Sequence, residues 1–128
     1  MKKSTPREMP TSRQAELEAL IFHESCAVDG IAIMIRMGQD PGRERMRRLN
    51  SVLQELEELT RGQTTLDRRL AYALFGLAVY PDQETRSWAR AGREWPGELV
   101  SEELIELVIH VERVFEGGLT GEEMDEAS

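Results

Sequence analysis

The longest apolar stretch of the chain lies between residues 14 and 37, and its pattern predicts one long helix. At 100° per residue, the apolar side chains fall into two sets on nearly opposite faces. The first set is Leu17, Leu20, Ile21, Val28, Ile31 and Ile35, and the second is Ala19, Phe22, Cys26, Gly30, Ile33 and Met37. A helix that is apolar on two sides is typical of an element that other helices surround. We prefer this helix to a short buried strand over residues 31–37, because the helical register continues unbroken from Leu17.

Turn and capping residues divide the rest of the chain into further helical segments. Apolar positions three and four residues apart predict helices over residues 41–61, 64–80, 82–91 and 101–116. Pro81 is expected to end the helix that precedes it, and the segment after it is short. Gly76 would let its helix pass close to another one, with Gly30 as the counterpart. The pattern therefore predicts an all-α fold, a compact helical bundle of four main helices plus one short helix, with the first helix central.

The two ends of the chain lack the pattern of a packed helix. Residues 1–12 contain two prolines and mixed charge without periodicity, which predicts a mobile N-terminal arm. Residues 118–128 are acidic and have no core pattern, which predicts a disordered tail. We therefore expect one helical bundle domain over residues 13–117.

Composition narrows the class of protein. A chain of 128 residues has the size of one domain and can form a core without disulfides. Cys26 is the only cysteine, which excludes an internal disulfide and is typical of a reducing compartment. No apolar run reaches the ~20 residues that cross a bilayer, and no apolar segment of a secretion signal follows the basic N-terminus. We expect a soluble, cytoplasmic protein without a membrane partner.

Charge is unevenly distributed along this chain, whose net charge is −8. From residue 94 onward, eleven carboxylates stand against one cation, Arg113. The helix over residues 41–61 carries its arginines near its N-terminus, against the preference of the helix dipole. We expect the acidic C-terminal third to compensate them; the alternative is a nucleoprotein subunit that binds phosphates through the arginine cluster at residues 43–48. The candidate phosphate-contacting residues are Arg43, Arg47, Arg68 and Arg69.

Glu24 is the carboxylate that lies deepest in the apolar stretch of the first helix. A buried carboxylate must be paired, hydrogen-bonded or neutral, and helical bundles build metal sites from such groups. The Glu-x-x-His motif of di-iron bundles does not occur in the sequence. We therefore interpret Glu24 as a buried polar residue bonded to an arginine, tyrosine or tryptophan, with a metal- or ligand-binding bundle around Glu24 as a further alternative.

Candidate catalytic groups are few. His23 and Cys26 stand one helical turn apart, where a thiolate–imidazolium pair could form, but no orienting group or oxyanion donor accompanies them. The sequence contains no dinucleotide-binding fingerprint, Walker loop or serine elbow. We therefore predict no catalytic residue, no metal and no cofactor.

The surfaces that remain favour a non-catalytic protein–protein interaction module, such as an adaptor, regulator, inhibitor or small assembly subunit. Ile105 and Ile109 lie about 100° from the main apolar stripe of the last helix, which is more apolar width than a monomer needs. The predicted partner is another protein or a second copy of the chain. The residues expected to bind it are Trp95, Glu102, Glu103, Ile105, Glu106, Ile109 and Glu112.

Overall fold

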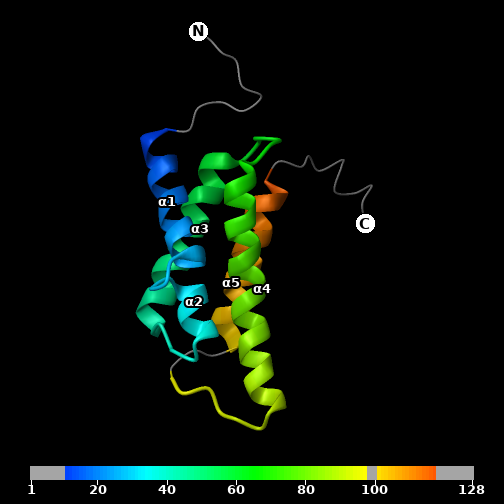
Figure 1. Cartoon of the computed structure of the whole chain (residues 1–128). Helices are drawn as coiled ribbons and strands as arrows, with labels where there is room; N and C mark the ends of the chain where they lie inside the picture. The colour runs from blue at the N-terminus through cyan, green and yellow to red at the C-terminus, as the bar shows by residue number, and fades with distance from the viewer. Residues whose placement is uncertain (1–10, 98–100, 118–128) are drawn as a thin grey trace, which may run out of the picture.

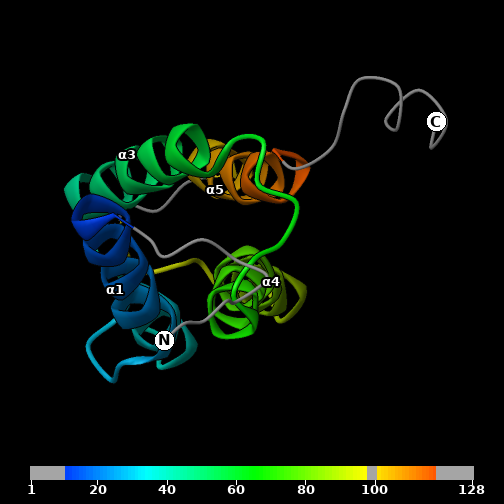
Figure 2. The ribbon, with the colours of Figure 1, turned by 90° about the horizontal axis from the view of Figure 1, so that it is seen from above.

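The computed structural model describes residues 11–97 and 101–117, which fold into five helices and contain no strand. The helices are α1 (Ser12–Cys26), α2 (Ile31–Arg36), α3 (Arg43–Thr60), α4 (Arg68–Arg90) and α5 (Ser101–Glu116). The four long helices stand at the corners of a bundle, and α2 lies below α1 (Figures 1 and 2). The predicted all-α helical bundle is confirmed. Its one short helix is α2, however, and not the segment over residues 82–91.

The predicted helix over residues 14–37 is interrupted between Cys26 and Ile31. Ala27 and Gly30 have extended backbones, with ψ of 153° and 159°. A Cβ atom at Gly30 would lie 2.2 Å from the carbonyl oxygen of His23, so the chain can fold back on the end of α1 only with glycine there. The prediction of one continuous helix is therefore wrong. Helical periodicity missed the break because the apolar residues on both sides of it face the same core.

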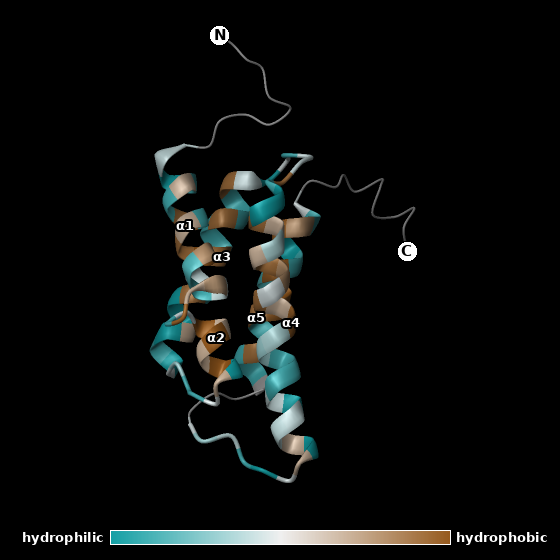
Figure 3. Cartoon of the chain, viewed as in Figure 1, coloured by the Kyte–Doolittle hydropathy of each residue, from teal (hydrophilic) through white to brown (hydrophobic). Residues whose placement is uncertain are grey.

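The first helix occupies one corner of the bundle and is not surrounded by the others (Figure 2). Leu17 and Ile21 of the first apolar set are fully buried, whereas Leu20 of that set and Ala19 and Cys26 of the second set are exposed. The predicted central position of the first helix is therefore wrong, and only Phe22 among the second-set residues of α1 packs against the core. The short α2 is mostly hydrophobic (Figure 3) and supplies more of the core. All five helices contribute buried apolar side chains, among them Leu17, Ile21, Ile31, Ile35, Met46, Leu53, Leu56, Leu74, Leu77 and Leu107.

Helix α4 continues through Pro81 to Arg90, so the predicted end at Tyr80 is wrong. Pro81 is itself buried, and packing of the apolar face on both sides of it outweighs the lost backbone hydrogen bond. The Cβ atom that alanine would add at Gly76 lies 2.8 Å from Ser25 Oγ of α1. Gly76 thus permits the close helix approach that the sequence indicated, but its counterpart is Ser25 and not Gly30.

A pair of tryptophans lies at the lower end of the bundle. The indole nitrogen of Trp95 donates a hydrogen bond of 2.8 Å to Asp40 Oδ1, which links the loop after α4 to the loop before α3. The Trp95 ring packs edge-on against Trp88 at 5.3 Å between centroids. Trp95 is half-buried against the core, so this contact holds two loops together.

The expected N-terminal arm and acidic tail lie outside the described residues, apart from Thr11 and Ser12 at the start of α1. Thr11 Oγ1 accepts a hydrogen bond of 3.0 Å from the backbone nitrogen of Gln14 and so caps α1. Within the described ranges, no helix combines the length and the hydropathy that spanning a bilayer requires.

Replacing Gly30 with alanine should lower the free energy of unfolding by about 3 kcal/mol, because the added carbon would collide with the His23 carbonyl oxygen. Chemical denaturation followed by far-UV circular dichroism measures this loss. Gly117→Ala is the matched control, since its added carbon would find its nearest atom at 3.4 Å, an ordinary contact. Equal losses in the two variants would contradict a steric requirement at Gly30.

Candidate functional site

Helix α5 directs part of its apolar surface outward. Its inner side carries Leu107, Val111 and Val114, which are buried in the core. Ile105 and Ile109 lie on a different side of the helix and are 57% and 37% exposed. These two isoleucines are the ones that the sequence pattern identified as surplus to a monomer's core.

Helix α4 presents a second apolar row beside them. Tyr72 and Phe75 are 63% and 52% exposed, and Val79 is half-buried. Their spacing of three and four residues continues to Asp82 and Arg86, so all five lie along one side of α4. Because Asp82 and Arg86 border α5, this row runs beside the exposed isoleucines. We call the combined surface the α4–α5 face, and it consists of Tyr72, Phe75, Val79, Ile105, Val108 and Ile109.

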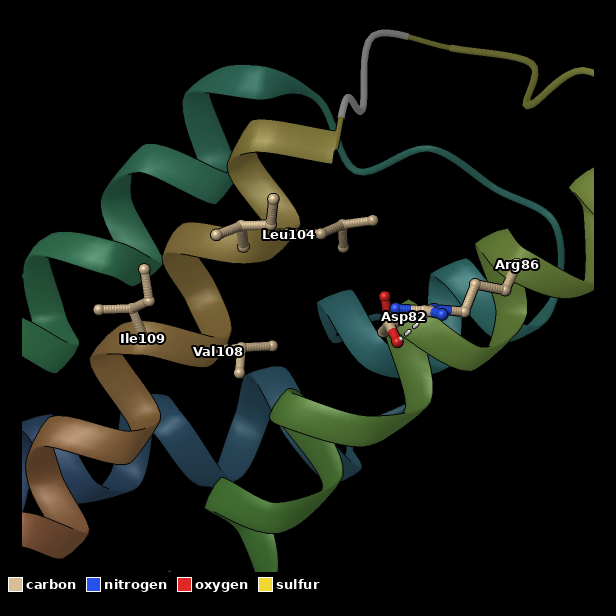
Figure 4. A pocket seen from close by; sticks show the side chains of 6 residues that line it. Asp82, Arg86, Leu104, Val108 and Ile109 are labelled. Carbon is tan, nitrogen blue, oxygen red and sulfur yellow. Dashed lines mark hydrogen bonds and ion pairs between the residues drawn. The ribbon is translucent and has the colours of Figure 1, made fainter. Parts of the chain in front are cut away.

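A shallow groove of about 230 Å³ separates the two helices at the lower end of the α4–α5 face. Leu104, Val108 and Ile109 line its α5 side, and Asp82 and Arg86 line its α4 side (Figure 4). Arg86 Nε lies 2.8 Å from Asp82 Oδ2, one helical turn away. The groove thus has an apolar wall on α5 and a charged wall on α4. Such a shape can take an apolar side chain that carries a polar neighbour.

The acidic residues of α5 divide between the surface and the interior. Glu102, Glu106 and Glu112 are exposed, as their predicted role in partner binding requires. Glu103 is buried, and its Oε1 accepts a hydrogen bond of 2.7 Å from Arg43 Nε on α3. Glu103 therefore links α5 to α3 inside the bundle, a position that does not suit contact with a partner.

Trp95 likewise lies away from the α4–α5 face. Its bond to Asp40 and its contact with Trp88 place it against the core at the lower loops. Trp95 was predicted to bind a partner, but these contacts hold its ring between two loops and against the core. Tyr72 and Phe75, by contrast, were not among the predicted partner-binding residues. Their signal in the sequence was the second apolar side of the helix over residues 64–80.

The arginines proposed to bind phosphates are not brought together. Arg43 and Arg47 stand near the start of α3, whereas Arg68 and Arg69 start α4 at the opposite end of the bundle (Figure 1). The Arg43 guanidinium is bonded to Glu103, and that of Arg69 lies 4.9 Å from the centroid of the Phe22 ring. Compensation of the α3 dipole by the acidic C-terminal third is therefore present at Arg43.

Glu24 joins three segments through Arg45. Its Oε1 accepts hydrogen bonds from Arg45 Nη2 at 2.6 Å and from the backbone nitrogen of Ile31 at 3.1 Å, and its Oε2 accepts one from Arg45 Nε at 3.2 Å. Arg45 also donates to the Asp29 carbonyl oxygen at 2.5 Å and contacts Met34 Sδ at 3.1 Å. Both carboxylate oxygens thus have partners, and Glu24 also caps the start of α2. Arg45 is an arginine partner of the kind expected for Glu24.

No three histidine, cysteine, aspartate or glutamate side chains within the described part of the chain gather closely enough to hold a metal. His23 Nε2 lies 3.1 Å from Asp29 Oδ1, on the outside of the α1–α2 break. Cys26 is exposed rather than part of the core, and no hydrogen bond joins it to His23. This arrangement orients His23 toward Asp29 and not toward the thiol.

A polar seam runs between α3 and α5. His110 is 6% exposed, and its Nε2 lies 3.5 Å from Gln54 Nε2. Burial lowers the pKa of His110 below its ordinary value of 6.5, and Arg113 lowers it further, against the opposing effect of Glu106 and Glu57. Burial between the two helices therefore disfavours the charged imidazolium form of His110.

Comparison of the chain with models of known protein families, with curated proteins and with solved structures found no match. A helical bundle by itself hosts many unrelated functions. The exposed residues of the α4–α5 face are therefore the basis for a functional conclusion.

Replacing Arg45 with methionine should lower the free energy of unfolding by about 2–4 kcal/mol, because it leaves the Glu24 carboxylate enclosed without its cation. Adding Glu24→Gln to this variant should recover part of the loss, which a double-mutant cycle by chemical denaturation measures. The matched control is Arg13→Met, which breaks the exposed α1–α3 pair of Arg13 and Glu55 and should cost much less. Additive effects of Glu24→Gln and Arg45→Met would show that the two side chains are not coupled.

Acidification should destabilise the bundle through His110. The unfolded imidazole, with a pKa near 6.5, binds a proton more readily than the folded one. Stability is therefore retained above that pH and falls as the pH drops through and below it. Melting temperatures measured from about pH 8 to about pH 5 should fall less steeply for His110→Gln than for the unaltered chain. His23→Gln is the control on an exposed histidine, and an identical pH slope in all three proteins would exclude His110 as the cause.

Proposed function

We propose that this chain is a non-catalytic protein–protein interaction module that binds its partner through the α4–α5 face. The observation that best supports this proposal is the exposure of Ile105, Tyr72 and Phe75 on neighbouring helices, where each side chain is more than half accessible to solvent. Single exposed apolar residues are ordinary, but a row on two adjacent helices is typical of an interaction surface. A cytoplasmic adaptor, regulator or small assembly subunit fits this surface.

Burial of apolar area supplies the free energy of the proposed binding. Covering a large aliphatic or aromatic side chain contributes about 1.5–3 kcal/mol, so a few such residues support specific association. The core of the bundle does not depend on these side chains, because the inner side of each helix is filled by others. Partner binding through this face therefore needs no rearrangement of the fold.

The charges beside the α4–α5 face favour a partner with cations at the edge of its own apolar surface. Glu102, Glu106 and Glu112 are exposed on α5 next to the two isoleucines. Charges at the rim of an interface act mainly on the association rate and on specificity. The proposed partner is therefore a protein surface with an apolar centre and with cations opposite α5.

A photo-crosslinking residue at position 105 should capture the partner, whereas the same residue at position 20 should not. Leu20 is the matched control because it is 47% exposed and apolar but lies on α1, away from the α4–α5 face. Ile105→Gln should reduce capture from host extract severalfold at unchanged melting temperature, and Leu20→Gln should not, because only the former removes apolar area from the proposed interface. Equal crosslinking from both positions would exclude the α4–α5 face as the binding surface.

A further inference from the structure

We propose that a second copy of this chain covers the α4–α5 face. The two copies are related by a two-fold axis parallel to the helices, so that α5 of each copy packs on α4 of the other. This inference rests on the proposed function and names the partner. The observation that supports it is the distribution of charge over the face, with cations on α4 and carboxylates on α5.

The two helices carry opposite charges beside their apolar rows. On α4, the exposed cations Arg68, Arg86 and Arg90 accompany the row of Tyr72, Phe75 and Val79. On α5, the exposed carboxylates of Glu102, Glu106, Glu112 and Glu116 accompany Ile105 and Ile109. Arg86 is bonded to Asp82 of its own helix, whereas Arg68, Arg90 and these four glutamates form no ion pair with any described residue. Each helix is thus a suitable partner for the other one in a second copy.

Oppositely charged residues at the ends of α4 and α5 also lie at the same heights, that is, at the same positions along the bundle axis. The backbone nitrogen of Gly62 donates a hydrogen bond of 2.7 Å to the Gly117 carbonyl oxygen, so the end of α5 lies beside the loop that leads into α4. At the other end, the groove places Arg86 beside Ile105. Measured along the bundle axis, Glu116 therefore lies level with Arg68. Glu102 lies level with the C-terminal end of α4, which carries Arg86 and Arg90. The two helices run in opposite directions, as Figure 1 shows.

Only one face-to-face two-fold arrangement brings these opposite charges together. An axis parallel to the helices preserves height and exchanges the two helices, so Glu116 meets Arg68 of the second copy. Ile105 meets the aliphatic part of the Arg86 side chain of the second copy, just beyond the apolar row of α4. An axis in the plane of the face but across the helices places α4 on α4 and α5 on α5. Arginines then face arginines and carboxylates face carboxylates, which is unfavourable. The favoured arrangement is isologous, because the same surface serves both copies.

The first test is the mass of the full chain in solution. Sedimentation velocity over a range of concentrations should give twice the chain mass of 14.6 kDa, with dissociation on dilution. Ile105→Gln, which alters both copies at once, should raise the dissociation constant by about tenfold or more. Leu20→Gln is the matched control and should leave it unchanged. A monomer at every concentration, or a dimer insensitive to Ile105→Gln, would overturn the proposal.

Charge reversal tests the orientation of the two copies. Arg68→Glu and Glu116→Arg should each weaken self-association, because each places like charges opposite one another across the interface. Both changes follow the preference of the helix dipole, since they add an anion at the start of α4 and a cation at the end of α5, so folding should not suffer. An equimolar mixture of the two variants should dimerise as the unaltered chain does, because both contacts between the copies are then complementary.

The mixture separates contacts between copies from contacts within one chain. Inside each single variant the residues at 68 and 116 remain alike in charge, so recovery on mixing can arise only between copies. Failure of the mixture to recover would overturn the proposed orientation. If the chain proves monomeric while the crosslinker at position 105 still captures a different protein, the second copy is excluded and the proposed binding function stands.

Discussion

The fold depends on the guanidinium of Arg45, which holds the end of α1, the turn after it and the start of α2 against α3. Glu24 receives two hydrogen bonds from it, and the Asp29 carbonyl oxygen receives a third. An enclosed ion pair adds little net stability, because desolvation offsets much of the attraction. Its effect is to define position. The six-residue α2 would be too short to persist alone, and the cap that Glu24 provides at Ile31 keeps it folded beneath α1.

The break between α1 and α2 determines which surfaces remain open. With α2 beneath it, α1 stands at a corner of the bundle (Figure 2) and leaves Leu20 and Cys26 exposed. Helices α2 and α3 supply buried side chains such as Ile31, Ile35 and Met46. The α3–α5 contact uses polar groups, including Glu103 with Arg43. The α4–α5 contact instead leaves apolar side chains on its outer side. Helix α5 thus packs on α3 through a partly polar contact and on α4 at its other side, and Ile105 and Ile109 remain exposed on its outer surface.

The candidate site was partly visible in the sequence. Ile105 and Ile109 were identified because their positions on a helical wheel exceed what one core stripe can bury, and that argument needs no knowledge of neighbouring helices. Glu103 was assigned to the surface in error, because its position on the wheel becomes internal only when α3 packs beside it. Tyr72 and Phe75 were not predicted to bind a partner, although they lie on a second apolar side of the helix predicted over residues 64–80. Which side of such a helix stays exposed depends on how many helices pack around it, and that number cannot be read from the sequence.

The sequence alone determined the helical class, the inner apolar rows and the concentration of negative charge in the last third, since these follow from local periodicity and composition. Tertiary structure decided where the first helix breaks, that α4 passes through Pro81, and which carboxylates meet an arginine. The reason is physical. Apolar periodicity repeats every turn and is read within a short segment, whereas a helix break at Gly30, a buried proline and the Glu24–Arg45 pair are stable only through contacts between residues that are distant along the chain.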